Sequence, residues 1–446
     1  MNESAAPAKL KRVLGLWDLV FYGIVLIQPI AAVGLFGIAQ QNSGGHMVAT
    51  ILIAMCAMMV TAISYGRMAS IYPSAGSAYT FVSLGLNVHL GFLAGWAMVL
   101  DYLILPIVSV VYAALTLVRL VPHVPFAVWI LVLISATTWL NLRGMRATAK
   151  SNIILLAGMS VVIALFFWFS TRFVLLHGGM SALFSMQPIY NPATFHLGTV
   201  LTATSFAALT YIGFDGVTTL AEDVENPRRN VLIATVLTCA ITGVFSSLQI
   251  YIAARVWPTY NDYPNVETAF LDVCGRAGGR YLFEAMAITL FVACVGSTLT
   301  AQVGAARLLY GMGRDGVLPR SLFGKLNEKT NAPAFNILFV GVLTVAGAFA
   351  LSYEHAAEVL NFGAFLAFMG VNLAVVRTFF FERDRQGWFA NLVVPIVGFL
   401  FCGAIWWSLP HLAKLIGSIW IVAGLVYLAI LTRGFRRAPA QLDFAE

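Results

Sequence analysis

The sequence Thr210-Tyr-Ile-Gly213-Phe-Asp215-Gly216 interrupts an apolar segment, 198–220, that is otherwise long enough to cross a lipid bilayer. Gly213 and Gly216 reduce the free-energy cost of leaving helical geometry. Asp215 places an ionisable side chain at the same point, where an unpaired charge at membrane depth is unfavourable. The pattern predicts a helix that is broken near the middle of the membrane.

A second interruption lies in the first apolar segment, 17–40, which contains Gln28-Pro-Ile-Ala-Ala-Val-Gly34-Leu-Phe-Gly37. Pro29 removes a backbone hydrogen-bond donor, and Gly34 and Gly37 favour departure from the helix. Two interrupted helices at corresponding positions in two halves of a chain indicate the binding site of an inverted-repeat transporter. The alternative is that these Gly and Pro residues serve only as packing notches or mild kinks, as is common in transmembrane helices.

The composition places the whole chain in a membrane. Of 446 residues, 60% are hydrophobic and only 10% are charged, and the mean hydropathy is +0.86. A soluble domain carries roughly 25% charged residues. The formal net charge is +7, but Lys and Arg stand in short clusters between apolar segments and form no single basic surface. Soluble proteins are therefore excluded, and nucleic acid is not an expected partner.

Charge clusters and Gly, Pro and Asn residues divide the chain into apolar segments of the length that a bilayer requires. They predict an all-α polytopic membrane protein with 12 transmembrane helices, so that both chain ends lie on the same side of the membrane. The predicted cores are 17–40, 47–66, 89–118, 126–142, 152–174, 198–220, 231–255, 281–311, 334–352, 357–380, 388–408 and 415–432.

The distribution of Lys and Arg predicts which side that is. If the N-terminus is inside, 19 of the 26 Lys and Arg residues lie in inner segments, as the positive-inside rule requires. We therefore expect a multi-pass protein of the cytoplasmic (inner) membrane, with cytoplasmic tails at 1–16 and 433–446 and no removable signal peptide. Short helices are expected at the inner surface in 73–86 and at the outer surface in 258–280.

Asp101 and Asp215 are the acidic residues that lie well inside predicted transmembrane segments. An ionisable group at this depth is a functional candidate because it must be paired, neutral or hydrated. Asp215 lies beside the helix break, where it is expected either to bind a cation or ammonium group or to cap broken backbone amides. Burial disfavours the charged form of Asp101, so this residue is a candidate proton carrier; the alternative is a hydrogen-bonded anchor between helices.

Signals of covalent catalysis and of metal binding are missing from the sequence. The seven His residues show no paired ligand spacing, there is no GxSxG motif, and the five Cys residues show no CxxC spacing. We expect no enzyme activity, no catalytic or metal-binding residues, no disulfide and no cofactor. A channel or a membrane-embedded sensor is the alternative to a carrier, and saturable uptake of a labelled solute would separate a carrier from both.

Three groups of motifs lie along the chain: Pro73-Ser-Ala-Gly-Ser-Ala-Tyr79; Gly213-Phe-Asp215 with Ala221-Glu-Asp223; and Ala306-Arg-Leu-Leu-Tyr-Gly-Met-Gly-Arg-Asp-Gly-Val-Leu-Pro319. Together they resemble the motifs of the amino acid–polyamine–organocation (APC) permeases, and the likeness covers nearly the whole sequence. Within this superfamily the chain is most similar to the bacterial putrescine importer branch, through motifs that include Gly91-Phe-Leu-Ala-Gly-Trp96, Leu100-Asp-Tyr-Leu103 and Asn361-Phe-Gly-Ala364.

The resemblance implies the leucine-transporter-type fold. This fold is an inverted repeat of five plus five helices followed by two C-terminal helices, with alternating access around breaks in helices 1 and 6. The implied repeats are 17–174 and 198–380, and the two additional helices lie in 388–432. The implied substrate-binding residues come from helices 1, 6, 8 and 10, beside Asp101 of helix 3; they are Gln28, Ala32, Val33, Gly34, Tyr211, Gly213, Phe214, Asp215, Cys294, Asn361 and Phe362.

Two departures from the family pattern bear on the substrate and on the coupling ion. Where putrescine importers are expected to carry an acidic residue in helix 1, this chain has Gly34. Where several amino acid permeases carry a helix 5 lysine that stands in for a sodium ion, the segment 152–159 has none. Coupling to H⁺ through Asp101 and coupling to Na⁺ through Ser297 and Thr298 therefore both stay open, although such hydroxyls more often bond to their own backbone.

Together these features predict a secondary active transporter that imports an amino acid or a small amine by alternating access, driven by an ion gradient. A putrescine or polyamine importer is the alternative. With Asp101 and Asp215 as the deep acids, a dicationic substrate lacks a second anionic partner, so a neutral amino acid or a monoamine is expected to bind better than putrescine. The oligomeric state stays open.

Overall fold

The computed structural model describes residues 14–72, 77–143, 149–314, 316–327, 330, 332–383 and 387–437. Most of the two predicted tails therefore lies outside the described residues, as does the first part of the surface helix expected in 73–86. Within the described residues the chain is helical, and the β-type contact is one isolated bridge between Leu14 and Val224.

The helical elements have the following bounds, in chain order: α1 (Leu16–Ile27), η1 (Val33–Leu35), α2 (Phe36–Asn42), α3 (Met47–Ile71), α4 (Ser77–Gly85), α5 (Val88–Leu120), α6 (Phe126–Leu142), α7 (Ala149–Leu183), α8 (Leu197–Ala207), η2 (Ala208–Tyr211), η3 (Phe214–Asp223), α9 (Pro227–Val256), α10 (Ala269–Arg314), α11 (Arg320–Phe323), α12 (Ala334–Ala350), α13 (Tyr353–Val375), η4 (Val376–Arg383), η5 (Phe389–Val393), α14 (Val394–Trp407) and α15 (His411–Leu431). Among the described residues, nine helical segments are long and apolar enough to cross a membrane. Three shorter apolar helices, α1, α6 and α12, occupy the remaining predicted positions. The prediction of an all-helical polytopic membrane protein is confirmed.

The first apolar segment is broken, as its sequence predicts. α1 ends at Ile27, and the following residue, Gln28, has φ +69°. The carbonyl group of Pro29 accepts a hydrogen bond of 3.1 Å from Nε2 of Gln249 on α9. This side chain supplies a partner that a continuous helix would otherwise provide. The chain resumes helical geometry in η1 and continues as α2, which ends at Asn42.

The sixth apolar segment is broken in a similar way. α8 gives way to η2, Ile212 is extended, and Gly213 has φ +114°, which L-residues rarely adopt. Asp215 lies in the first turn of η3, which follows. The hydroxyl group of Tyr211 donates a hydrogen bond of 2.8 Å to the carbonyl oxygen of Ile51 on α3. The broken segment is thereby fixed to a neighbouring continuous helix.

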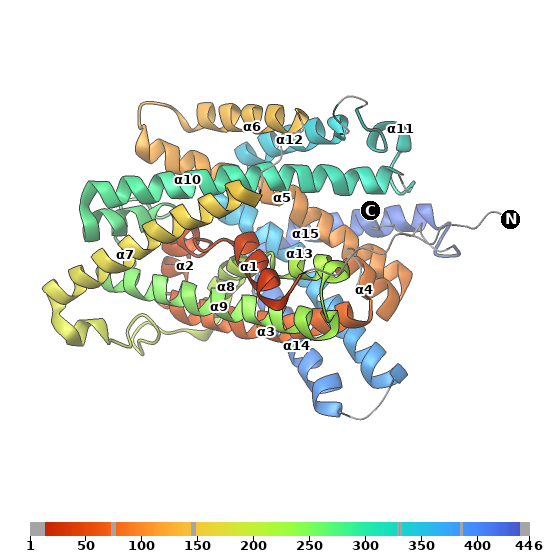
Figure 1. The fold of residues 1–446 in the computed structure, drawn as a ribbon, viewed down its shortest axis with the longest axis horizontal. Coiled ribbons are helices and arrows are strands. Elements are labelled where there is room, and N and C mark those ends of the chain that lie inside the picture. Colours follow the sequence, from red (N-terminus) through yellow and green to blue (C-terminus); the bar gives the residue numbers. More distant parts are fainter. Residues whose placement is uncertain are drawn as a thin grey trace.

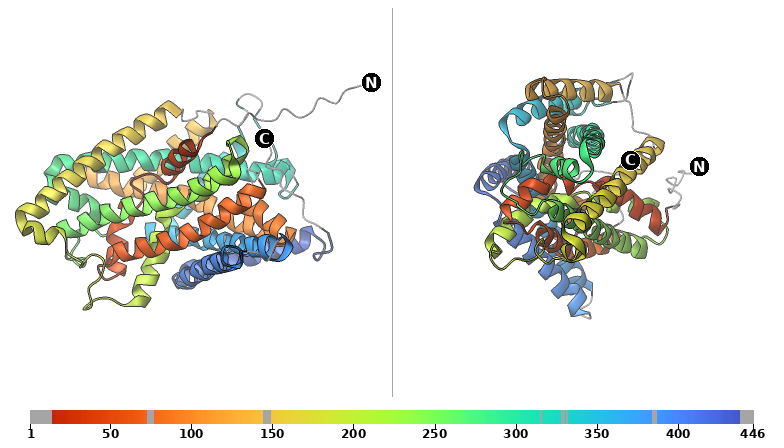
Figure 2. Two further views of the ribbon diagram at one scale, coloured as in Figure 1. Left: turned by 60° about the horizontal axis from the view of Figure 1, so that its bottom comes forward. Right: turned by 90° about the vertical axis from the view of Figure 1, so that its left-hand side faces the viewer.

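The bundle has two ends, which we name by the elements found there. The terminal end is where α1 begins and α15 ends, and the loop end is where α2 is followed by α3. Figure 1 shows most helices running along the long axis, and the right-hand view of Figure 2 shows them nearly end-on. The short helix α4 follows α3 at the terminal end and matches the helix expected in 73–86. At the loop end, α10 bends at Gly279, where φ is +71°, so a helical arm precedes its longer part.

Pairs of continuous helices form the frame of the bundle. α3 packs along α9, α5 packs along α10 and α13, α10 packs along α7, and α6 packs along α12. Of the broken segments, α1 packs on α9 and η3, and α8 packs on α3 and α2. The π-helices η4 and η5 extend from the body of the bundle at its lower edge in Figure 1. The broken segments are therefore held against continuous helices.

Two tryptophans attach α15 to this frame. The indole N–H of Trp96 donates to the carbonyl oxygen of Trp420 at 2.9 Å, and the indole N–H of Trp420 donates to the carbonyl oxygen of Trp96 at 2.8 Å. The two rings are stacked with their centroids 4.8 Å apart. Because lipid offers no hydrogen-bond partner, this reciprocal arrangement satisfies both indole groups inside the protein.

Candidate functional site

The two broken segments touch at their breaks. A Cβ atom at Gly213 would lie 3.6 Å from Cγ1 of Ile27 and 3.7 Å from the carbonyl carbon of Leu26. The break of α8–η2–η3 therefore lies against the last turn of α1. Backbone groups that two regular helices would have used internally are thus brought together at one point in the bundle.

Gly34, which follows the break in the first segment, faces two tyrosine side chains. A Cβ atom there would lie 3.0 Å from Oη of Tyr353 and 3.2 Å from Cζ of Tyr112. These two rings are tilted by 41° with centroids 4.9 Å apart, and Phe206 meets the ring of Tyr353 edge-on at 6.2 Å. We call Phe206, Tyr112 and Tyr353 the aromatic group. It covers the break from α8, α5 and α13, and glycine permits this close approach.

The loop end beyond the aromatic group is closed. Phe36 on α2 packs against Tyr263 and Phe270, with ring centroids 5.6 Å and 5.7 Å apart. Nδ2 of Asn42 donates a hydrogen bond of 2.5 Å to Oε1 of Glu354, which joins the end of α2 to the start of α13. α2 is therefore fixed on both sides, and the loop end is packed by the buried rings of Phe36, Tyr263 and Phe270.

An ion pair reinforces this closure. Arg119, near the end of α5, forms a bidentate ion pair with Asp272 at the start of α10. The same guanidinium group donates to Oγ1 of Thr268 at 2.8 Å and lies 5.4 Å from the ring centroid of Phe283. Bidentate arginine–carboxylate pairs fix geometry as well as adding energy. This contact holds α5 and α10 together at the loop end.

On the terminal side of the aromatic group, α5 and α10 meet through hydroxyl groups. Oγ of Ser109 and Oγ of Ser297 lie 2.9 Å apart. Oγ1 of Thr298 donates to the carbonyl oxygen of Cys294 at 2.8 Å, the backbone bond that such hydroxyls commonly make. Nε2 of Gln28 lies 3.5 Å from another carbonyl oxygen of α10, so the break in the first segment also faces this helix.

The two deep acids lie nearer the terminal end. Tyr112 follows Asp101 on α5 by 11 residues, and a rise of roughly 1.5 Å per residue separates them by about 16 Å along the helix. Asp101 and Asp215 are both buried, and the charge of Asp215 acts on Asp101. Asp215 lies in the first turn of η3, directly after the break at Gly213. Oδ1 of Asp101 has no hydrogen-bond partner in the described part of the chain.

Asn361 and Phe362 face different neighbours, although they are adjacent on α13. Nδ2 of Asn361 donates to the carbonyl oxygen of Ser205 on α8 at 2.7 Å. The ring of Phe362 packs against Trp406 of α14, with centroids 5.1 Å apart. Asn361 therefore contacts a broken segment, whereas Phe362 points toward the two C-terminal helices.

The other predicted residues of the breaks are buried in packing contacts. Ala32 and Val33 are 0% and 1% exposed at the start of η1. The ring of Phe214 packs against Tyr65 of α3 and Phe368 of α13, with centroids 5.4 Å and 5.2 Å apart. These side chains fix the breaks against the frame and leave their backbone groups as the available polar atoms.

Four further residues join the site in the structure and were not among the predicted set: Phe206, Tyr112, Tyr353 and Glu358. Tyr112 and Tyr353 belong to the aromatic group, and Oη of Tyr112 is buried without a hydrogen-bond partner among the described residues. Glu358 on α13 is only 3% exposed. The sequence analysis did not select Glu358 because it stands at the start of the predicted segment 357–380, and acidic residues at segment ends normally reach water. A carboxyl group inside an apolar pattern was the available signal.

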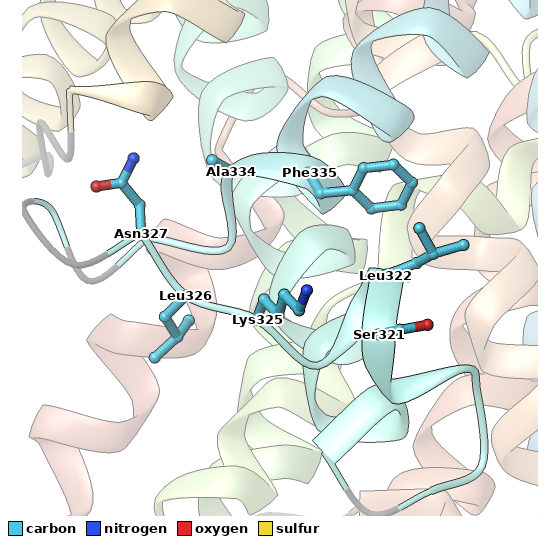
Figure 3. Close-up of a pocket in the computed structure, with 7 residues that line it drawn as sticks. All are labelled: Ser321, Leu322, Lys325, Leu326, Asn327, Ala334 and Phe335. Atoms are coloured by element: carbon cyan, nitrogen blue, oxygen red, sulfur yellow. The ribbon is translucent and has the colours of Figure 1, made fainter.

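Two cavities lie away from the aromatic group. One, of about 260 Å³, lies between α1, α7 and α9, and its lining includes Gln28 and Pro29. The other, of about 290 Å³, lies between α11 and α12 (Figure 3); its lining residues are Ser321, Leu322, Lys325, Leu326, Asn327, Ala334 and Phe335. The cavity in Figure 3 is peripheral and contains no residue of either break.

Groups suited to metal or disulfide chemistry do not gather in the described ranges. Within them, no set of three or more His, Cys, Asp or Glu side chains is placed to hold a metal ion. Cys294 and the four other cysteines are free thiols. The site therefore consists of backbone groups, aromatic rings, hydroxyls and a few carboxyls, which suits reversible binding of a small polar solute.

Comparison with known proteins agrees with this description. The sequence matches the amino acid permease family over residues 14–431. It is 30% identical to the low-affinity putrescine importer PlaP of Escherichia coli (strain K12), over 99% of this chain and 98% of that protein. It is 26% identical to the branched-chain amino acid permease BcaP of Bacillus subtilis (strain 168), over 96% and 95% of the two chains. It is 28% identical to the vacuolar cationic amino acid transporter 4 of Arabidopsis thaliana, over 84% and 64%. The chain belongs to the amino acid permease family of the APC superfamily, and it is a secondary transporter of amino acids or amines and not an enzyme.

Proposed function

We propose that the protein imports an amino acid or a small amine by alternating access and that an ion gradient drives the import. The observation that carries the proposal is the contact between the two breaks, where Gly213 lies against the last turn of α1. Unwound backbone at this depth supplies carbonyl and amide groups that can bind the charged groups of a substrate. The closed loop end corresponds to one of the two states that alternating access requires.

The inverted repeat of 17–174 and 198–380 is part of this proposal. If each helix of the first repeat corresponds to the helix five positions later, α3 pairs with α9, α5 with α10 and α6 with α12. Each of these pairs is in contact. The contact of α7 with α10 then corresponds to that of α13 with α5, and the contact of α1 with α9 corresponds to that of α8 with α3. A pseudo-two-fold arrangement accounts for this correspondence; α14 and α15 lie outside it.

The orientation of the protein follows from its positive charges. With 19 of 26 Lys and Arg residues on the side of the chain ends, the terminal end is cytoplasmic and the loop end faces outward. The protein then lies in the inner membrane with both tails in the cytoplasm. In this orientation the packed loop end would face the outside.

The substrate contacts are assigned to the breaks and to the helices that face them. We assign backbone groups of Gln28, Ala32, Val33 and Gly34, and of the stretch 211–215, to the charged groups of the substrate. Cys294 and Asn361 form the side wall together with the aromatic group. Phe362 supports this wall from the side of α14. Relatives that import putrescine or branched-chain amino acids support a substrate that is either an amino acid or a small amine, with putrescine as the alternative.

Asp101 is the coupling residue in this proposal, with H⁺ as the ion. Its buried Oδ1 lacks a partner among the described residues, so a proton would neutralise it where no other group does. Ser297 and Thr298, the alternative Na⁺ ligands, already bond to Ser109 and to the backbone of α10. This favours H⁺ over Na⁺.

Uptake into proteoliposomes of purified protein tests the function. We expect saturable uptake of a labelled amino acid or amine, faster when a pH gradient is imposed. Gly213→Val should abolish it, because a β-branched residue cannot adopt φ +114° without strain. Gly198→Val is the matched control, because a Cβ atom at Gly198 meets no atom within 4 Å. Uptake that rises linearly with solute concentration would instead indicate a channel.

A further inference from the structure

Glu358 is a buried acidic residue of α13 whose carboxyl group has no partner among the described residues. Its exposed fraction is 3%, and within the described residues it forms no hydrogen bond and no ion pair. An unpaired carboxylate at such a position is unfavourable. A protein that keeps a residue of this kind commonly uses it to bind a ligand.

The helix places Glu358 on the face of α13 that meets the broken segments. Glu354, Glu358 and Asn361 are spaced i, i+4 and i+7, so they share one face. The first of them is bonded to Asn42 at the end of α2, and the last is bonded to Ser205 on α8. Glu358 lies between these two contacts, where α13 meets the segments whose movement would open the loop end.

A line of carboxyl groups leads from the loop end to Glu358. Glu267 lies in the connection before α10, Glu354 in the first turn of α13, and Glu358 one turn deeper. The charge of Glu354 acts on both of the others. Arg119, the nearby cation of α5, is already paired with Asp272. Glu354 is thus close enough to act on both Glu267 and Glu358, and carboxyl groups gathered in this way attract positive charge.

We propose that Glu358 binds the ammonium group of an amine, or the side-chain cation of a cationic amino acid, as the substrate enters from the loop end, and that this residue makes the protein selective for organic cations. The inference rests on the proposed import function and names the substrate class: monoamines, diamines or cationic amino acids. It departs from the preference expected from the sequence, which counted only Asp101 and Asp215 as deep acids and therefore placed a neutral amino acid or a monoamine above putrescine. Glu358 supplies the additional anionic partner that a cationic group requires.

Competition against labelled uptake tests this role. Putrescine and lysine serve as cationic competitors and leucine as the neutral one. We expect Glu358→Gln to raise the half-inhibiting concentrations of putrescine and lysine by about tenfold or more, as loss of a buried charge partner requires. The value for leucine should change less than about twofold. Glu358→Asp should restore part of the cation affinity.

Glu284→Gln is the matched control, since Glu284 lies in the loop-end half of α10 but is partly exposed and paired with Arg280. It should leave the half-inhibiting concentrations of all three competitors unchanged.

Equal loss of cationic and neutral competition in Glu358→Gln would assign the residue a structural role and overturn the proposal. A variant with intact affinities that no longer accumulates substrate on a pH gradient would identify Glu358 as a proton site, which also overturns it. The proposal is also overturned if the wild-type protein binds leucine but neither putrescine nor lysine. Wild-type vesicles that take up no amino acid or amine would contradict the import function itself, a result distinct from any change in selectivity.

Discussion

The hydroxyl oxygen of Tyr353 lies 3.0 Å from the point at which Gly34 would carry a Cβ atom. This single approach joins the start of α13 to the break in the first apolar segment, and Tyr112 approaches the same point from α5 at 3.2 Å. A side chain at residue 34 and the aromatic group therefore compete for the same volume. The acidic residue expected at this position in putrescine importers would not fit here unless both rings moved.

Gly34→Ala should hinder closure of the loop end. One added methyl group displaces Tyr353 and Tyr112, and overpacking of this kind costs about 1–3 kcal/mol, so we expect uptake to fall by about tenfold. Tyr353→Phe removes the nearest atom and should partly restore uptake in the double variant. Gly158→Ala is the control, because a Cβ atom there meets nothing within 4 Å. Normal uptake by Gly34→Ala would show that the aromatic group does not have to close over this residue.

Asp215→Asn should reduce uptake strongly while leaving an inserted, folded protein. The carboxylate is buried directly after the break at Gly213, and an Asn side chain carries no charge and only one acceptor oxygen. Loss of a charge-assisted hydrogen bond of about 1.5–3 kcal/mol would lower the rate of uptake by about tenfold or more. Size-exclusion profiles of the purified variant check its folding. A variant that transports with wild-type rate and affinity would remove Asp215 from the site.

Asp101→Asn should abolish accumulation driven by a pH gradient while some exchange of labelled for unlabelled substrate continues. The amide resembles the protonated carboxyl permanently, and exchange requires no net proton movement. Ser297→Ala serves as the control for the Na⁺ alternative and should leave pH-driven accumulation intact. If wild-type uptake follows a Na⁺ gradient and ignores pH, Asp101 is an anchor and the α5–α10 hydroxyls become the better candidates.

Glu267→Gln should change how stability depends on pH. Burial, and then the charge of Glu354, raise the pKa of Glu267 above the usual range of a glutamate. The folded protein therefore holds this proton more tightly than the unfolded chain does. The free energy of unfolding contributed by Glu267 is present below the usual glutamate pKa and is lost as pH rises through the raised value.

Melting temperatures measured from acidic to neutral pH check this prediction. The melting temperature of Glu267→Gln should match that of the wild type at acidic pH. It should exceed the wild-type value increasingly as pH rises through the raised pKa of Glu267. A pH-independent difference between Glu267→Gln and the wild type would contradict the stated environment of this carboxyl.

Much of the site follows from local sequence, but its side-chain neighbours do not. The breaks at Gln28 and Gly213 are predictable because proline and glycine act on their own backbone. The direction of Phe362 is not predictable, since it depends on α14, which packs on α13 from another part of the chain. The burial of Glu358 likewise depends on how other helices pack on α13, and its sequence position suggested a residue near water.

The sequence by itself determined that the chain is a helical membrane protein, where its apolar segments lie, that two of them are broken, and to which family it belongs. These properties depend on composition and on the conformational freedom of single residues, which act over a few positions. Only the tertiary structure decided that Tyr112 and Tyr353 meet over Gly34, that the loop end is closed, and that Glu358 is a third deep acid. These contacts join residues far apart in the chain, and they form only when the helices have packed and water and lipid have been excluded between them.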